Sequence, residues 1–72
     1  MIIIYGKESC PYCDMAKDLA TRKGHNVEYK QLGVDYEFSE LKEKFPKART
    51  FPQIILDGIS IGGYTDLENL ID

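Results

Sequence analysis

The sequence is poor in cysteine and histidine, with two cysteines and one histidine, and it has no tryptophan. A tetrahedral structural zinc site needs four ligands, so Cys10, Cys13 and the lone His25 weigh against one. A disulfide-stapled scaffold also needs more cysteines. Two cysteines separated by two residues in a chain of 72 therefore indicate redox chemistry, with no metal expected.

The sequence also has no excess of positive charge. Nine Lys and Arg stand against twelve Asp and Glu, which gives a net charge of -3, and the charges are interspersed along the chain. A protein that grips a phosphate backbone usually carries a basic stripe. We therefore expect no nucleic-acid partner.

Long hydrophobic runs are absent as well. The longest apolar run, at the N-terminus, is far shorter than the roughly 20 residues of a membrane-spanning helix, and no basic leader precedes it. The hydrophobic fraction of 43% and the charged fraction of 29% are typical of a globular protein. We expect one cytoplasmic, monomeric domain over residues 1–72, with no membrane contact.

The first half of the chain has the pattern of a βαβ unit. Residues 2–5 form a β-branched and aromatic run typical of a buried strand, and Pro11 suits the first position of a helix. Apolar residues at helical spacing then predict a helix over 11–23, which Gly24 ends. Residues 27–32 alternate as a half-exposed strand does, parallel to the first strand.

A second helix is expected in the middle of the chain. Phe38, Leu41 and Phe45 recur at spacings of three and four, which places them on one helical face, and Pro46 ends the pattern. This helix should cover one face of the sheet.

The last third of the chain predicts a hairpin and a short helix. Asp57-Gly58 between the apolar runs 54–56 and 59–61 is a strong signal for two antiparallel strands. Thr65 and Glu68 fit a capping box, with Thr65 as the N-cap of the last helix. The residues expected to face the core from this helix are Leu67, Leu70 and Ile71.

Cys10 is expected at the turn between the first strand and the first helix, at or beside the helix N-cap. Unpaired backbone N–H groups and the positive end of the helix dipole favour a thiolate over a thiol there. Cys13, one turn further along, should be more deeply covered.

Three short motifs in this predicted β-α-β-α-β-β-α order resemble those of the dithiol glutaredoxins. They are Cys10-Pro11-Tyr12-Cys13 after the first strand, Thr50-Phe51-Pro52 before the third, and Gly62-Gly63 after the fourth. The resemblance covers nearly the whole chain. It implies an α/β, thioredoxin-like fold with a four-stranded mixed sheet and three helices. It also implies an enzyme that reduces protein disulfides and glutathione mixed disulfides, with glutathione as co-substrate.

The resemblance assigns roles to individual residues. It makes Cys10 the nucleophile, Cys13 the resolving thiol and Pro52 a cis-proline facing the dithiol. The backbone of Phe51 would then pair with the cysteine of glutathione as an added strand does. Tyr12 would line the groove that holds the tripeptide.

Glutathione carries two carboxylates, and two kinds of receptor are expected for them. Lys7 and Arg49 are cationic, and the turn over 63–66 offers helix N–H groups to the γ-glutamyl carboxylate. Many family members carry other residues at Tyr64 and Thr65. The complete set of expected glutathione contacts is Lys7, Tyr12, Arg49, Thr50, Phe51, Pro52, Gly63, Tyr64, Thr65 and Asp66.

The sequence leaves two other functions open. One is a redoxin of the same fold that thioredoxin reductase reduces without glutathione. The other is an iron–sulfur module in which Cys10 from two chains and two glutathiones hold a cluster, a reading that Pro11 weakens. Glutathionylated or disulfide-bonded proteins are the partners that the resemblance implies, with ribonucleotide reductase among them.

Overall fold

Seven elements follow one another in the predicted β-α-β-α-β-β-α order. The computed structural model describes all residues, 1–72. The elements are β1 (Ile2–Gly6), α1 (Pro11–Arg22), β2 (Val27–Gln31), α2 (Phe38–Lys44), β3 (Gln53–Leu56), β4 (Ile59–Gly62) and α3 (Tyr64–Ile71). None of the three helices combines the length and the apolar composition that crossing a bilayer would take.

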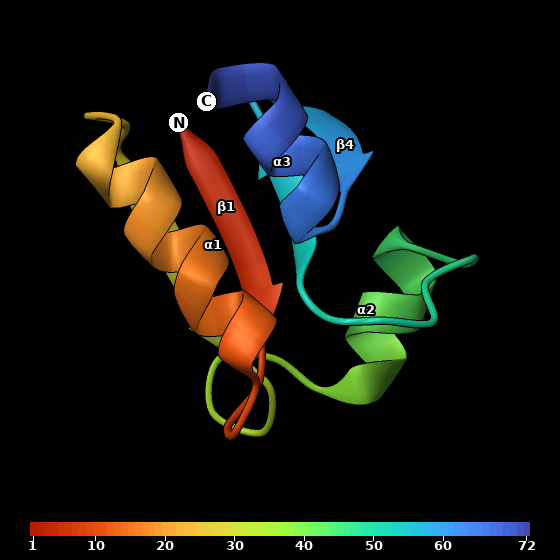
Figure 1. Ribbon diagram of the computed structural model, residues 1–72. Helices are drawn as coiled ribbons and strands as arrows, with labels where there is room; N and C mark the ends of the chain where they lie inside the picture. The colour runs from red at the N-terminus through yellow and green to blue at the C-terminus, as the bar shows by residue number, and fades with distance from the viewer.

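The four strands form one mixed sheet in the order β2-β1-β3-β4 (Figure 1). Strand β1 pairs with β2 in parallel, as the βαβ pattern predicts, and with β3 in antiparallel fashion. The hairpin between β3 and β4 turns at Asp57 and Gly58, whose φ angles of 48° and 86° are both in the left-handed region. This conformation is typical of two-residue hairpin loops.

Two hydrophobic cores lie on opposite faces of the sheet. One contains Ile4 of β1 and Leu19 of α1 together with Leu67 of α3, so α1 and α3 cover the same face, toward the viewer in Figure 1. The other contains Tyr5, Tyr36, Leu41 and Phe45, and it includes the buried side of α2. Neighbouring residues of β1 serve different cores because side chains alternate along a strand.

The start of the last helix differs from the sequence-based prediction. Helix α3 begins at Tyr64 with Gly63 as its N-cap, so Thr65 is not the cap. The carboxylate of Asp66, at position N3, accepts a hydrogen bond of 2.9 Å from the Gly63 backbone N–H. Glu68 instead accepts a bond of 3.2 Å from the Tyr64 hydroxyl. Asp66 reaches back from N3, as an acidic residue does in a capping box, and this sets the helix start.

Two hydrophobic residues are also more exposed than their spacing predicts. Leu70 is 60% exposed, whereas Leu67 is fully buried and Ile71 is partly buried. Helix α3 has only eight residues and buries a narrow stripe, so the third predicted core residue faces outward. Phe38, at the first position of α2, is 55% exposed for the same reason: only Leu41 of that helix is buried.

Tyr36 joins the segment before α2 to the end of β1. Its hydroxyl donates a buried hydrogen bond of 2.8 Å to the carbonyl of Gly6. Burial raises the pKa of Tyr36 from 10.0 to about 12. The neutral phenol is therefore the form that the fold favours.

We expect Tyr36→Phe to lower the free energy of unfolding by about 1 kcal/mol, because it removes the hydrogen bond from the Tyr36 hydroxyl to the Gly6 carbonyl. The loss is no larger because that carbonyl still accepts a hydrogen bond from the Leu32 N–H. Tyr29→Phe is the matched control, since the Tyr29 hydroxyl is exposed and lies 3.5 Å from its acceptor, the Lys7 carbonyl. Urea unfolding measures the free energy of unfolding of both variants. Equal costs for the two variants would contradict this.

The wild type should also lose stability as pH rises from 10.0 to about 12, because the fold disfavours the Tyr36 phenolate. Tyr36→Phe should lose less stability over the same pH range.

Candidate active site

The two cysteines lie where β1 leads into α1. Cys10 is the N-cap of α1, with an extended backbone at φ -121° and ψ 98°, and Pro11 occupies the first helical turn. Ser9 before it has a φ of 53°, in the left-handed region that few residues other than glycine adopt. This kink turns the chain from the strand into the helix, and the predicted N-cap position of Cys10 is confirmed.

Cys10 and Cys13 form a disulfide, with their Cα atoms 5.2 Å apart. The backbone N–H of Cys13 donates to the Sγ atom of Cys10 at 3.2 Å. Cys10 retains an exposed fraction of 7%, whereas Cys13 has none, so Cys13 is the more covered sulfur, as predicted. Attack from solvent is therefore directed to Cys10. The same N–H is placed to stabilise negative charge on that sulfur after reduction.

A groove of about 330 Å³ lies against the start of α1. Eight of the ten predicted glutathione contacts line it, and no other residue does: Tyr12, Thr50, Phe51, Pro52, Gly63, Tyr64, Thr65 and Asp66. They come from three segments far apart in the sequence. The rings of Tyr12 and Tyr64 lie 5.9 Å apart between centroids.

The groove residues Thr50, Phe51 and Pro52 lie directly before β3. The Phe51–Pro52 peptide bond is cis, as the motif predicts, and Pro52 is buried. The Gln53 side-chain amide donates a bond of 2.7 Å to the Thr50 carbonyl and so holds the loop before the cis bond. This role of Gln53 was not predicted, and its only signal in the sequence is a polar residue at the start of an apolar strand.

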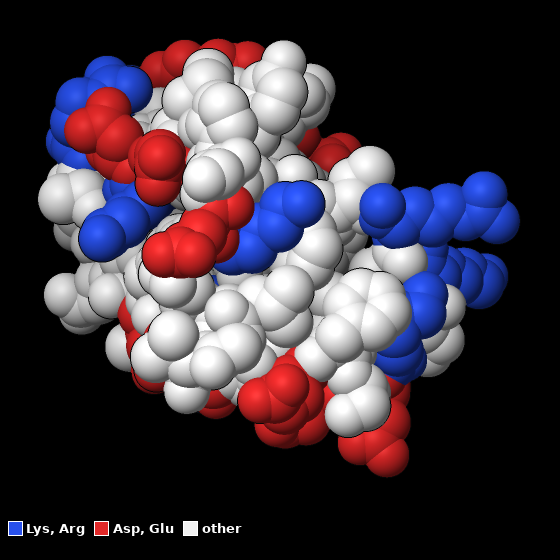
Figure 2. Space-filling view, turned by 90° about the horizontal axis from the view of Figure 1, so that it is seen from below, with Lys and Arg blue, Asp and Glu red and all other residues white.

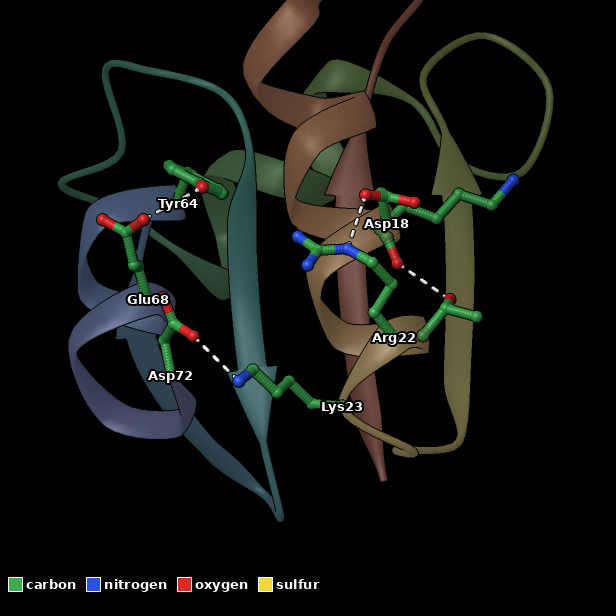
Figure 3. Close-up of polar contacts among 8 residues, drawn as sticks. Asp18, Arg22, Lys23, Tyr64, Glu68 and Asp72 are labelled. Carbon is green, nitrogen blue, oxygen red and sulfur yellow. Dashed lines mark hydrogen bonds and ion pairs between the residues drawn. The ribbon is translucent and has the colours of Figure 1, made fainter.

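Tyr64 forms one wall of the groove and remains protonated at neutral pH. Partial burial and the hydrogen bond to Glu68 raise the pKa of its phenol (Figure 3). The ring therefore offers a neutral surface near the disulfide.

The two predicted cations are not part of the groove lining. The Nζ atom of Lys7 lies 5.2 Å from the centroid of the Phe51 ring, which puts Lys7 at the edge of the groove. Arg49 lines a neighbouring pocket, which shares Thr50 with the groove. Each cation therefore lies beside one groove residue, Lys7 beside Phe51 and Arg49 beside Thr50.

The two glycines after β4 have different roles. Gly62 has a φ of 107°, and a Cβ atom there would collide with the Asp66 carboxylate. Gly63 has a φ of -110°, and its added Cβ would make an ordinary contact of 3.5 Å with the Pro52 carbonyl. Gly62 thus allows Asp66 to cap α3. Gly63 lines the groove, as the predicted contact list has it, whereas Gly62 does not.

The residues that could ligate a metal ion do not gather in the fold. No group of three or more His, Cys, Asp or Glu side chains is arranged to hold one. The chemistry that this site itself offers is thiol–disulfide exchange.

Comparison with known proteins identifies the family to which the chain belongs. The sequence profile of the glutaredoxin family matches residues 2–61, which include both cysteines, the cis-proline and most of β4. The chain belongs to the glutaredoxin family. It is 47% identical over 73 aligned positions to glutaredoxin 1 of Rickettsia prowazekii, covering 96% of this chain and 75% of the relative. Glutaredoxin 3 of Escherichia coli is 41% identical over 66 positions, covering 89% and 77%.

Solved glutaredoxin structures have the same fold. Oxidised Escherichia coli glutaredoxin superimposes with a TM-score of 0.78 at 36% identity, covering 94% of this chain and 88% of that one. The glutaredoxin of Brucella melitensis gives a TM-score of 0.75 at the same identity, covering 96% and 75%. Family and disulfide together make this glutaredoxin a thiol–disulfide oxidoreductase with a thioredoxin-like fold.

Gly62→Ala should lower the free energy of unfolding by about 1–3 kcal/mol, since an L side chain is strained at this φ and displaces Asp66. Gly63→Ala is the matched neighbour and should cost less than about 1 kcal/mol, because its backbone suits any residue. Urea unfolding of the two variants tests the assignment. A larger cost at Gly63 would refute it.

Proposed function

We propose that this glutaredoxin uses glutathione to reduce glutathione mixed disulfides and protein disulfides. The observation that carries the proposal is the groove against the start of α1, the helix that Cys10 caps, whose lining consists of eight residues expected to bind the tripeptide. A groove of about 330 Å³ is of the size that small-molecule sites have.

In this proposal both ends of glutathione find partners. The first N–H groups of α3 have no acceptor within the helix and would bind the γ-glutamyl carboxylate. The carboxylate of Asp66 would meet the γ-glutamyl ammonium. Lys7, at the edge of the groove, would pair with the carboxylate of the glycine end, with Arg49 in the neighbouring pocket. The Phe51 backbone would pair with the central cysteine.

The chemistry is a sequence of thiolate exchanges. The Cys10 thiolate attacks the glutathione sulfur of a glutathionylated protein, the S–S bond breaks, and the protein leaves as a thiolate that takes up a proton. A second glutathione thiolate then attacks the glutathione sulfur held on Cys10, which releases oxidised glutathione and restores the Cys10 thiolate. Cys13 can instead attack the Cys10 sulfur and expel glutathione, forming the disulfide described above. Two glutathione molecules would reduce that disulfide.

A stabilised Cys10 thiolate would assist one step more than the other. Stabilisation raises the fraction of Cys10 present as thiolate, but it lowers the nucleophilicity of that thiolate with a Brønsted slope of about 0.4–0.5. The rate of attack by Cys10 therefore increases little. The rate at which Cys10 leaves its mixed disulfide does increase, because a more stable thiolate is a better leaving group. The Cys13 N–H at the helix start supports this second step.

The deciding experiment is reduction of a glutathionylated peptide, coupled to glutathione reductase. The wild type should turn over, Cys10→Ser should be inactive, and Cys13→Ser should remain active because a second glutathione can complete the cycle. Reduction that needs thioredoxin reductase and ignores glutathione would instead identify a redoxin of the same fold. Loss of activity in Cys13→Ser would rule out the one-cysteine route.

Lys7→Glu should decrease the fraction of Cys10 present as thiolate and raise the KM for glutathionylated peptide, since it puts a negative charge at the groove edge. Thiolate absorbance in the ultraviolet, followed across pH in the reduced protein, measures the first effect. Lys23→Glu, at the far end of α1, is the charge-matched control and should change neither quantity. An unchanged thiolate fraction in Lys7→Glu would exclude the electrostatic role.

We extend the proposal to a monomeric cytoplasmic enzyme with ribonucleotide reductase among its substrates. The likeness to the glutaredoxin family supports the ribonucleotide reductase role. Turnover of ribonucleotide reductase with this protein, glutathione and glutathione reductase as its sole reducing system is the corresponding test.

A further inference from the structure

The positive charges of this acidic protein are unevenly distributed. Residues 42–49, from the end of α2 into the loop before β3, contain four Lys or Arg and one acid, Glu43. The rest of the chain contains five Lys or Arg and eleven Asp or Glu. In Figure 2 a group of blue side chains stands out at the right-hand edge of the face, whereas blue atoms on the left lie against red ones.

The cations outside this segment all have partners. Ion pairs join Arg22 to Asp18 at 2.9 Å and Lys23 to Asp72 at 2.9 Å (Figure 3). The other pairings are Lys30 with Glu28, Lys7 with the Phe51 ring, and Lys17 with the Tyr29 ring.

Within the segment only Lys42 has partners. Its Nζ atom donates to the carbonyls of Pro46 at 3.2 Å and Ala48 at 2.8 Å, which shapes the loop. Lys44, Lys47 and Arg49 make no ion pair, cation–π contact or side-chain hydrogen bond in the structure. Three exposed cations without partners are therefore gathered at the end of α2 and on the loop that follows it.

These three cations line one pocket of about 480 Å³, the largest in the molecule. No acidic side chain lines it, and Glu43 lies outside. Gln53 and Ser60 add polar groups. Thr50 lines both this pocket and the glutathione groove, so the pocket and the groove are adjacent.

We propose that this basic pocket docks an acidic segment of the protein substrate, whose Asp or Glu side chains lie next to the cysteine being reduced. The inference rests on the proposed function, because the adjoining groove would hold the glutathione part of the same substrate. The partner's chain would cross Thr50 and place its carboxylates against Lys44 and Lys47. A long polyphosphate fits less well, since the many acids outside the segment would repel it.

The expected effect is selectivity and not general activity. Exposed ion pairs are individually weak, and their contribution falls with salt, because charges are screened beyond about 10 Å at 0.1 M ionic strength. Complementary charge acts mainly on the rate of encounter. The preference for acidic substrates should therefore appear in kcat/KM at low salt.

The test compares two glutathionylated peptides of the same length, one with Asp and Glu around the cysteine and one with Asn and Gln. The wild type should prefer the acidic peptide by about three- to tenfold in kcat/KM at low salt, and the ratio should fall toward one at high salt. Lys44→Gln/Lys47→Gln should remove most of that preference. Arg22→Gln/Lys23→Gln, which makes the same change in net charge about 18 Å along α1 from Cys10, should retain it.

Equal turnover of both peptides by the wild type would overturn the inference and leave the proposed function intact. Failure to turn over either peptide would refute the proposed function, and a binding measurement then decides the inference independently. In that measurement ¹⁵N-labelled protein is titrated with the acidic peptide carrying Ser in place of Cys. Shifts of the backbone amides of Lys44, Ala48 and Thr50 support the docking site. Shifts with inorganic phosphate and none with the peptide overturn it.

Discussion

The fold and the site depend on how the chain passes from β1 into α1. Cys10 is the last residue before the helix, and its sulfur accepts a hydrogen bond from the Cys13 N–H, which also donates to the Cys10 carbonyl at 3.1 Å. Pro11 fits the next position because its missing N–H costs nothing there. One backbone geometry thus exposes one sulfur, covers the other and directs a donor at the exposed one.

The central position of β1 makes the groove possible. Because β1 lies between β2 and β3, the start of β3 comes beside the start of α1, although Cys10 and Pro52 are far apart in sequence. Helix α3 follows β4 directly and returns over the same face as α1. Its first residues therefore complete the wall opposite Tyr12.

Features set by local chemistry were predictable from the sequence. The Asp57-Gly58 turn, the Gly24 helix end and the order of the elements follow from propensities that act over a few residues. Five of the eight groove residues belong to the three motifs, and Tyr64, Thr65 and Asp66 were expected at the groove only as the start of the last helix. The roles of Asp66 and Leu70 were not predictable, since the start of α3 depends on the conformation of Gly62 and on the narrow area that α3 buries. The four cations of residues 42–49 are visible in the sequence, but the pocket that three of them line is not. Lys23 forms an ion pair with Asp72, which is far away in sequence, whereas Lys44 and Lys47 form none. The spacing of charged residues in the sequence does not predict which lysines are paired.

The two ends of the chain come together at the pole opposite the cysteines (Figure 1). The N-terminal ammonium is paired with Asp57 of the hairpin, and Asp72 is paired with Lys23 at the last turn of α1. A fluorescent reporter or a second protein fused at either end would therefore leave the groove and the basic pocket uncovered. Fusion at the C-terminus would preserve the ammonium–Asp57 contact, which makes that end the better attachment point for a redox sensor built on this scaffold.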